Sequence, residues 1–321
     1  MDTAPIARLC GVPEAQVVLA RSASAAFHDL LRSLDLDADA EILLPVSICA
    51  SMVLAALAAG AVPVIVDCDE TFAMSAAAAT DRLTPHSRVL VFHHPFGRAS
   101  DLSAIRGALA RRSDVIVVED CAQAPGTAAG GRTSGSAGDV ALLSFGARKP
   151  IDAGVGGALV LPADTPVRTI APPSGSQHGD AGILTAAEET RIFDALAKLA
   201  ARTAQRLAKV QAALPCRTAG SAGPPADIHH RLVLDVAPSV RARAVERFAD
   251  ICEVPQPPGP SFATPGLAQR YRAAGRDDLW DPAGDALPIW HALAATRLLV
   301  RTDAAVSETR LRQLCRMVGA A

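Results

Sequence analysis

The sequence has no excess of either charge. Its 321 residues include 31 lysines and arginines against 33 aspartates and glutamates, a formal net charge of −2 with the eight histidines neutral. Binding to nucleic acid or to an anionic membrane normally needs a basic surplus, so neither is expected as a partner. Lysine is scarce as well: nearly all the basic residues are arginines, and the three lysines are Lys149, Lys198 and Lys209.

Signals for metal binding, export and membrane insertion are also missing. The seven cysteines are odd in number and none are spaced as CxxC, which favours reduced thiols in a cytoplasmic protein over a zinc site or a disulfide framework. No basic region followed by a clean apolar run opens the chain, so no signal peptide is expected. The most apolar stretch, Ala50–Val66, is interrupted by Ser51, Gly60 and Pro63 and predicts a helix, a turn and a strand, not a membrane span.

Half of the residues are hydrophobic, which is enough for a substantial core and excludes a disordered chain. In the first half, short apolar runs rich in β-branched residues alternate with helix-like stretches. This order is typical of an α/β fold with a mostly parallel sheet covered on both faces. The predicted strands are Ile42–Leu44, Val62–Val66, Val89–Phe92, Val115–Val118, Val140–Phe145 and Ala158–Leu161, and the predicted helices are Ala23–Leu34, Ser51–Ala59 and Asp101–Arg111.

The composition changes near residue 171, where Ala171–Gly182 has the Pro, Gly and Ser content of a linker or loop. We therefore expect a large domain over residues 1–170 and a smaller C-terminal α+β domain over residues 171–321. The elements predicted in the second domain are a long helix over 185–214, strands at Arg231–Val236 and Arg297–Arg301, helices at Val240–Asp250 and Ser307–Val318, and a Pro-rich connection at Val254–Pro265.

Polar residues follow three of the predicted strands: Asp67, the pair His93 and His94, and the pair Glu119 and Asp120. Ligands of α/β sheets bind at the carboxyl ends of the strands. The sequence therefore predicts an active site at this edge of the sheet.

Lys149 lies in a Gly-rich turn between two apolar strands. Partial loss of hydration there would lower its pKa and free the amine as a nucleophile, although a surface-loop lysine is the simpler interpretation of Lys149 alone. Asp120, at a strand end, is placed to pair with a pyridinium nitrogen and keep the ring electron-poor; the alternative is a carboxylate that only caps a turn. Together the two residues fit pyridoxal 5′-phosphate (PLP) held as a lysine Schiff base.

A phosphate group needs hydroxyls and a helix N-terminus. Ser22 and Ser24 open the first predicted helix, and Ser144 precedes Lys149 by five residues. Either of the first two serines could simply be an N-cap. Both interpretations are compatible, because capping and phosphate binding use the same free backbone N–H groups.

The order of these motifs resembles that of the DegT/StrS family of PLP-dependent aminotransferases, the sugar aminotransferases of fold type I. The resemblance runs in register through roughly the first half of the chain. The matching segments are Ser22–Ala26 with SGTxA, Ala59–Asp67 with AGAxPVxVD, His94–Gly97 with HxYG, Glu119–Ala124 with EDxAQA, Gly135–Asp139 with GSxGD, and Ser144–Lys149 with SFxxxK, followed by GxGG.

The resemblance implies a fold type I enzyme, PLP as cofactor, a small-molecule substrate and a homodimer. It makes Lys149 the Schiff-base lysine and proton shuttle, Asp120 the partner of the pyridine nitrogen, and Gln123 a hydrogen-bond partner of the ring hydroxyl. His94 is a candidate near the substrate, with a packed or capping histidine as the alternative. The residues implied to hold the phosphate are Ser144, Ser24 and the backbone amides of Ala23 and Ser24.

Two family motifs differ in this chain. In the segment that matches PSxT[FWY], Cys49 occupies the position of an aromatic residue that stacks on the cofactor ring, so the ring loses packing. The GxNxRM motif aligns poorly with Gly179–Leu184, which has neither the Asn nor the Arg. Because the C-terminal half also matches weakly, substrate and dimer contacts are not carried over.

The predicted function is an aminotransferase that moves an amino group from an amino-acid donor to a keto acceptor, either a keto sugar or another biosynthetic intermediate, through Lys149. Two alternatives stay open. One is a PLP-dependent lyase, decarboxylase or racemase acting on an amino-acid-like substrate. The other is a PLP-binding protein without turnover that serves as a regulatory or partner subunit.

Overall fold

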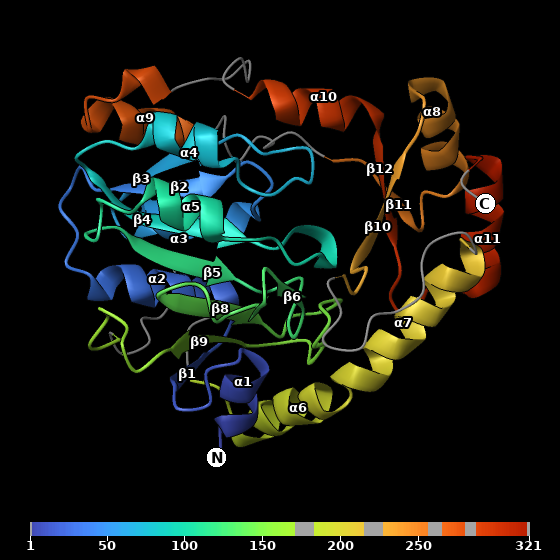
Figure 1. Ribbon diagram of the computed structural model, residues 1–321, viewed down its shortest axis with the longest axis horizontal. Helices are drawn as coiled ribbons and strands as arrows, with labels where there is room; N and C mark the ends of the chain where they lie inside the picture. Colours follow the sequence, from blue (N-terminus) through green and yellow to red (C-terminus); the bar gives the residue numbers. More distant parts are fainter. Residues whose placement is uncertain (1, 171–182, 215–226, 256–264, 280–286, 320–321) are drawn as a thin grey trace.

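The computed structural model describes residues 2–170, 183–214, 227–255, 265–279 and 287–319. A large part is built on a seven-stranded sheet and a smaller part on a three-stranded sheet, side by side (Figure 1). The predicted linker Ala171–Gly182 and most of the predicted Pro-rich connection lie outside the described residues, as does most of the segment compared with GxNxRM.

The large sheet has the strand order β1-β9-β8-β5-β4-β2-β3. Strands β2 to β8 of this sheet pair in parallel, and β9 pairs antiparallel with both β8 and β1. The mostly parallel α/β sheet is therefore confirmed, and each of the six predicted strands is present. The strands are β1 (Gln16–Ala20), β2 (Glu41–Pro45), β3 (Val62–Val66), β4 (Ser87–His93), β5 (Ile116–Asp120), β8 (Val140–Ser144) and β9 (Gly157–Leu161).

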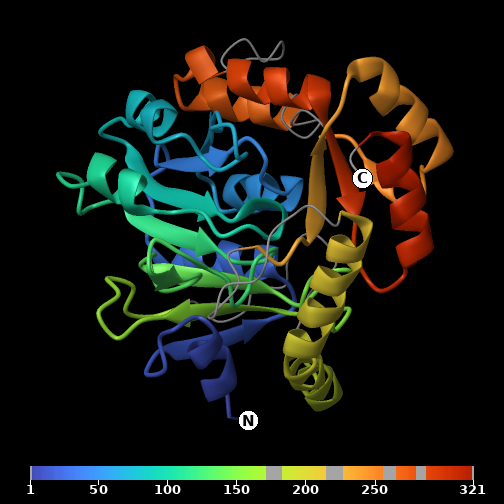
Figure 2. The same cartoon turned by 45° about the vertical axis from the view of Figure 1, so that its right-hand side comes forward.

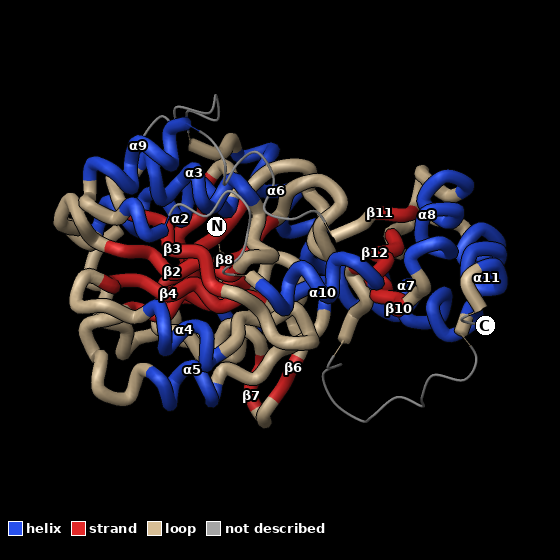
Figure 3. Tube along the Cα trace, turned by 90° about the horizontal axis from the view of Figure 1, so that it is seen from above, coloured by secondary structure: helices blue, strands red, loops and turns tan. Residues whose placement is uncertain are grey.

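Helices cover both faces of this sheet (Figure 3). On one face, α2 (Ala23–Ser33) and α3 (Ala50–Ala58) bury Phe27 and Met52 against residues such as Val91. On the other, α4 (Ala76–Arg82) and α5 (Ser103–Ala108) bury Ala79 and Ile105. The sequence did not predict α4, β1 or the short helix α1 (Ala4–Leu9).

The small part is an antiparallel sheet, β10-β12-β11, with helices packed on it. Its strands are β10 (Arg231–Asp235), β11 (Cys252–Glu253) and β12 (Arg297–Arg301), and its helices are α7 (Leu199–Ala213), α8 (Pro238–Arg247) and α11 (Glu308–Met317). Val210, Leu234, Val300 and Leu314 lie buried in the core between them. The smaller α+β unit agrees with the prediction.

The single helix predicted over 185–214 is wrong, because the chain forms two helices, α6 (Ala186–Ala197) and α7, which meet at Lys198. Ile192 and Ala195 of α6 pack into the core of the large part, whereas Val210 of α7 packs into that of the small part. The apolar spacing continues through the junction, so the sequence pattern does not reveal the change of direction. Figure 1 shows α7 running from the large part to the small one.

The C-terminal half returns to the large part after β11. Helices α9 (Pro265–Ala273) and α10 (Pro288–Thr296), neither of them predicted, lie along its upper side (Figures 1 and 2). The Tyr271 hydroxyl donates to the Pro63 carbonyl at 2.8 Å. Residues beyond 170 therefore contribute to the core of the large part as well as to that of the small part. The domain boundary expected between residues 170 and 171 stays a prediction.

Asp67 fastens α10 to the end of β3. Its carboxylate accepts hydrogen bonds from the backbone N–H groups of Ile289 at 2.9 Å and Trp290 at 3.0 Å, which is the position where a helix binds an anion. Asp67 therefore acts as a helix cap, although its place at a strand end had pointed to the active-site edge. None of the helices in the described ranges has the length and apolar content needed to cross a lipid bilayer.

Candidate active site

A cavity of about 150 Å³ opens at the carboxyl edge of the large sheet. It brings together all eight residues that the sequence nominated, from the ends of β5 and β8, the segments that follow β4, β5 and β8, the start of α2 and the residue before α3. The lining consists of Ser22, Ala23, Ser24, Ile48, Cys49, Ser51, Met52, His93, His94, Asp120, Ala122, Gln123, Ser144 and Lys149.

Lys149 lies in the turn between β8 and β9. Its backbone N–H donates to the Gly146 carbonyl at 3.2 Å, and the Asp152 carboxylate accepts from the N–H groups of Arg148 at 3.0 Å and Gly154 at 3.2 Å. These bonds fix the turn that presents the Lys149 amine to the cavity.

Asp120 ends β5 and faces the same cavity. Its Oδ1 accepts from the Ala122 N–H at 2.9 Å, whereas Oδ2 has no hydrogen-bond partner among the described residues. Burial raises the pKa of Asp120, and the positive charge of Lys149 partly opposes that rise. A half-buried carboxylate with an unused oxygen fits a protonated ring nitrogen, which would supply both the missing donor and a compensating charge.

The start of α2 offers a phosphate site. Ser22 Oγ accepts from the Ala25 N–H at 3.1 Å and lies 3.1 Å from Ser24 Oγ, so Ser22 is the N-cap. The Ser24 N–H has no acceptor among the described residues, as expected in a first helical turn that is open to an anion. Gly157 of β9 lets this turn approach the sheet, since a Cβ at that position would lie 2.4 Å from the Ala23 nitrogen.

Gln123 is held so that its amide nitrogen is free. Its Oε1 accepts from the Phe96 N–H at 2.8 Å, and Phe96 adopts the left-handed backbone conformation, with φ of 59°. Nε2 therefore remains available as a donor to a ring hydroxyl.

Glu119, next to Asp120, points to the opposite side of the sheet and organises a loop there. Its carboxylate accepts from His94 Nε2 and from the N–H groups of Gly135, Ala137 and Gly138, each at 2.8 Å. Burial raises the pKa of Glu119, but these hydrogen bonds outweigh burial and hold the pKa below its ordinary value. The Gly135–Asp139 motif is thus the loop that wraps the Glu119 carboxylate.

His94 is engaged at both ring nitrogens. The Ser100 N–H donates to Nδ1 at 3.0 Å, so Nε2 bears the proton that is donated to Glu119. This geometry favours the packed histidine over the substrate contact, although the ring does line the cavity.

The family model for DegT/DnrJ/EryC1/StrS aminotransferases matches residues 4–217. The chain belongs to this family. The resemblance to this family is therefore confirmed, and the matched region contains each of the eight cavity residues that the sequence nominated.

Two curated relatives illustrate the range of the family. The UDP-N-acetyl-3-dehydro-α-D-glucosamine 3-aminotransferase of Acidithiobacillus ferrooxidans is 35% identical over 162 residues, which are 50% of this chain and 43% of the relative. The dTDP-3-amino-3,4,6-trideoxy-α-D-glucose transaminase of Micromonospora megalomicea is 37% identical over 142 residues, 44% of this chain and 38% of the relative. The chain thus matches less than half the length of either.

Among solved structures, Spr1654 of Streptococcus pneumoniae, described as a putative sugar aminotransferase, superposes with a TM-score of 0.77 at 18% identity and covers 98% of this chain and 90% of that one. At this identity the likeness shows the fold, and it confirms the fold type expected from the sequence. Spr1654 was solved in PLP and PMP forms. The family and these forms indicate pyridoxal phosphate as the cofactor, and the cavity residues fit it.

His93 is a cavity residue to which the sequence analysis gave no role beyond its place at a strand end. It pairs with Asp120 in the β4–β5 register, so both side chains emerge on one face of the sheet. Ser47 donates to the Phe72 carbonyl at 3.0 Å, so its oxygen accepts from His93 Nε2 at 2.8 Å. Burial lowers the pKa of His93 to about 3, which leaves a neutral ring whose Nδ1 has no hydrogen-bond partner in the described part of the chain.

A larger cavity of about 650 Å³ lies between α5 and the hairpin formed by β6 (Ala128–Ala129) and β7 (Arg132–Thr133). Its buried wall includes His94 and Glu119, whose polar atoms are already bonded to each other and to backbone. The smaller cavity is the better candidate, because it contains the amine of Lys149 and the unused oxygen of Asp120.

Proposed function

We propose that this protein transfers an amino group from an amino-acid donor to a keto acceptor, with pyridoxal phosphate held at Lys149. One observation supports this most directly. The Lys149 amine, the half-satisfied carboxylate of Asp120 and the open N-terminus of α2 line a single cavity, and these groups match the aldehyde, ring nitrogen and phosphate of the cofactor.

The bound cofactor supplies an electron sink for the charge that develops at the donor's α-carbon. Asp120 keeps the proton on the ring nitrogen. Lys149 Nζ holds the cofactor between turnovers and moves the proton at the α-carbon. Ser24, Ser144 and the amides of Ala23 and Ser24 anchor the phosphate, and Gln123 Nε2 donates to the ring hydroxyl.

We further propose a keto sugar as acceptor, a homodimer and a cytoplasmic location. The acceptor is suggested by the sugar-nucleotide substrates in the relatives' names. The location is supported by the cysteines in the described residues, all of which are free thiols. Sedimentation of the PLP-loaded protein measures its oligomeric state. An active species that is strictly monomeric would contradict the homodimer.

Incubation of the PLP-loaded protein with L-glutamate or L-glutamine tests the reaction. Transamination converts the cofactor to its pyridoxamine form, with loss of the visible absorbance band and release of the keto acid. Release of keto acid or ammonia without that conversion would indicate elimination, and an unchanged spectrum with every donor would indicate a protein without turnover. Either result would contradict the proposed transfer. Mass analysis of products from a panel of keto sugars and keto acids would then identify the acceptor.

Cys49 gives a separate test of the cofactor position. It is the N-cap residue of α3, is exposed, and lines the cavity. If it lies over the cofactor ring, Cys49→Phe should either tighten PLP by about 1 kcal/mol through restored stacking or block a substrate that uses the space, lowering turnover while PLP stays bound. PLP affinity, turnover and melting temperature are measured on the same variant. A fall in melting temperature alone would mean that Cys49 is only a packing residue.

A further inference from the structure

The segment that leads into β10 packs against Gly97, next to a residue that is hydrogen-bonded to Gln123 of the cofactor cavity. The Ile228 N–H donates to the Gly97 carbonyl at 2.9 Å, and a Cβ on Gly97 would lie 2.4 Å from the His230 nitrogen. Gly97 ends the short 3-10 helix η1 (Pro95–Gly97), in which the Phe96 N–H is bonded to Gln123. The small part of the molecule is thus connected to Gln123, a predicted cofactor residue, through two hydrogen bonds and the Phe96–Gly97 peptide.

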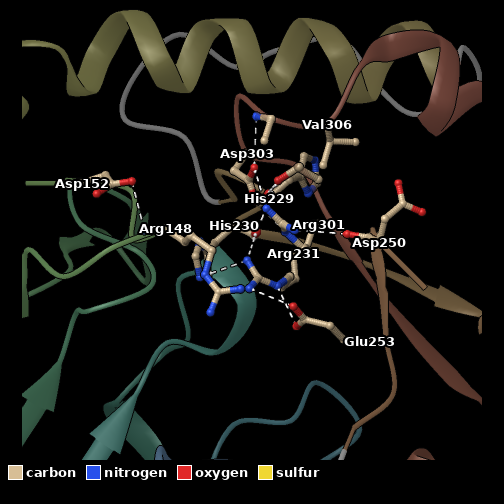
Figure 4. Close-up of polar contacts among 12 residues, drawn as sticks. Arg148, Asp152, His229, His230, Arg231, Asp250, Glu253, Arg301, Asp303 and Val306 are labelled. Carbon is tan, nitrogen blue, oxygen red and sulfur yellow. Dashed lines mark hydrogen bonds and ion pairs between the residues drawn. The ribbon is translucent and has the colours of Figure 1, made fainter. Parts of the chain in front are cut away.

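His230 and Arg231 meet Arg148 at this junction (Figure 4). Arg231 Nη1 donates to the His230 carbonyl at 3.0 Å and lies 3.4 Å from His230 Nε2. Because a guanidinium only donates, Nε2 accepts and Nδ1 bears the proton. Nδ1 has no partner among the described residues, although His230 is only 6% exposed. Burial, with the charges of Arg231 and Lys149 next in effect, lowers the pKa of His230 well below its ordinary value, so the ring is a neutral donor.

Two arginines in this group have no acidic partner. Arg206 of α7 is 6% exposed, and its Nε and Nη1 are buried without a hydrogen-bond partner in the described chain. Arg148 is exposed, and its guanidinium also has no hydrogen-bond or ion-pair partner in the described chain. The nearby acids are taken: Glu253 binds Arg231 at 3.0 Å and Asp303 binds Arg301 at 2.9 Å. The charge of Asp303 acts on Arg206, but no acid among the described residues is hydrogen-bonded to this buried guanidinium, which is unfavourable by itself. A bound anion would supply the missing acceptors.

The backbone at Arg148 is a second sign of a functional constraint. Arg148 precedes Lys149 and has a φ of 66°, in the left-handed region that favours glycine. Strain of this kind persists where the surroundings require it and gathers at binding sites. Here it fixes the backbone of the residue directly before the proposed reactive lysine.

We propose that Arg148, His230, Arg231 and Arg206 bind the anionic oxygens, carboxylate or phosphate, of the substrate that reacts at Lys149. The proposal rests on the proposed function for what reacts there. Arginine suits both kinds of anion because its N–H groups form paired hydrogen bonds with their oxygens. Lys149, which is within electrostatic reach of His230, would then receive a substrate whose charged end is already fixed.

Arg148→Gly is the sharpest variant, because glycine adopts the left-handed conformation without strain and only the side chain is lost. Arg206→Met removes a cation that has no partner, so it should not lower the melting temperature. Arg148→Lys restores a charge at the same position. Arg243→Gln, on the exposed surface of α8, removes the same charge elsewhere and serves as the control.

Binding of glutarate and of inorganic pyrophosphate to the PLP-loaded protein is measured by calorimetry. We expect Arg148→Gly and Arg206→Met each to lower the affinity for at least one of the two anions by roughly 10- to 100-fold, which is the loss typical of a hydrogen bond to a charged group. Arg148→Lys should recover part of that affinity. A lower affinity for glutarate alone would mean that the site binds a substrate carboxylate, and a lower affinity for pyrophosphate alone would mean that it binds a substrate phosphate. If the parent binds neither probe, or if both variants bind like Arg243→Gln, the proposal is overturned.

Probe binding also separates this proposal from the proposed function. The measurement requires no turnover, so anion binding that is lost in Arg148→Gly would stand even if no donor were transaminated. Conversely, normal transamination with unchanged probe binding in both variants would reject the anion site and leave the aminotransferase intact.

Discussion

Borohydride reduction of the PLP-loaded protein, followed by peptide mapping, will place the cofactor on Lys149. Lys149→Arg keeps a positive charge in the cavity but offers no amine for the covalent link or for proton transfer. We expect it to yield no adduct and to lower turnover by roughly 10²–10⁴-fold from lost proton transfer alone. The melting temperature should change little, because the backbone of the turn is held by Asp152.

The other two lysines are the internal controls. Burial lowers the pKa of Lys209, which by itself would make it a rival nucleophile. Its Nζ is occupied, however: it donates to the backbone carbonyls of Asp303 at 2.8 Å and of Val306. Lys198 lies at the junction of α6 and α7. Lys198→Arg should therefore form the borohydride-reduced adduct on Lys149 and have the same turnover rate as the parent. An adduct on Lys198 or Lys209 in the parent would refute the assignment.

The sequence allowed the large sheet and the cavity to be predicted because both depend on local patterns. Continuous apolar runs fixed the strands, and the residues that follow them meet at one sheet edge through the parallel pairing alone. Lys149, Asp120 and Ser24 thus come together from separate segments. Successive side chains of a strand point to opposite faces of the sheet, so Asp120 faces the cavity and Glu119 faces the other side. This alternation follows directly from the prediction of a strand at β5.

Other features depend on distant contacts that leave no local pattern. The capping of α10 by Asp67 joins residues more than two hundred positions apart, so Asp67 resembled an active-site carboxylate in the sequence. The bend at Lys198 arises because α6 and α7 pack on different cores. The approach of His230 to Gly97 depends on how the two parts of the molecule pack, and no spacing in the chain predicts it.

Asp120→Asn should bind PLP and fold normally but lose most of its turnover. The amide has the shape of the carboxylate and can still accept from the Ala122 N–H. It has no negative charge to hold the proton on the ring nitrogen, so charge developing at the donor's α-carbon is less stabilised. We expect kcat to fall by roughly 10²–10³-fold, the usual cost of removing one preorganised electrostatic group, with a smaller effect on the KM for the donor.

Glu119→Gln provides the matched comparison, because it changes the adjacent carboxylate on the other side of the strand. Glu119 accepts from three backbone N–H groups and from His94. In Glu119→Gln the side-chain NH₂ group is itself a donor, so it would face some of those donors without forming a hydrogen bond. This variant should lose about 3 kcal/mol of folding free energy or more and melt at a lower temperature, while the molecules that remain folded bind PLP. Steady-state kinetics and thermal melts on both variants separate the two roles. If Asp120→Asn turned over like the parent, Asp120 would be only a cap for the turn after β5; if its loss appeared as instability like that of Glu119→Gln, its role would be structural.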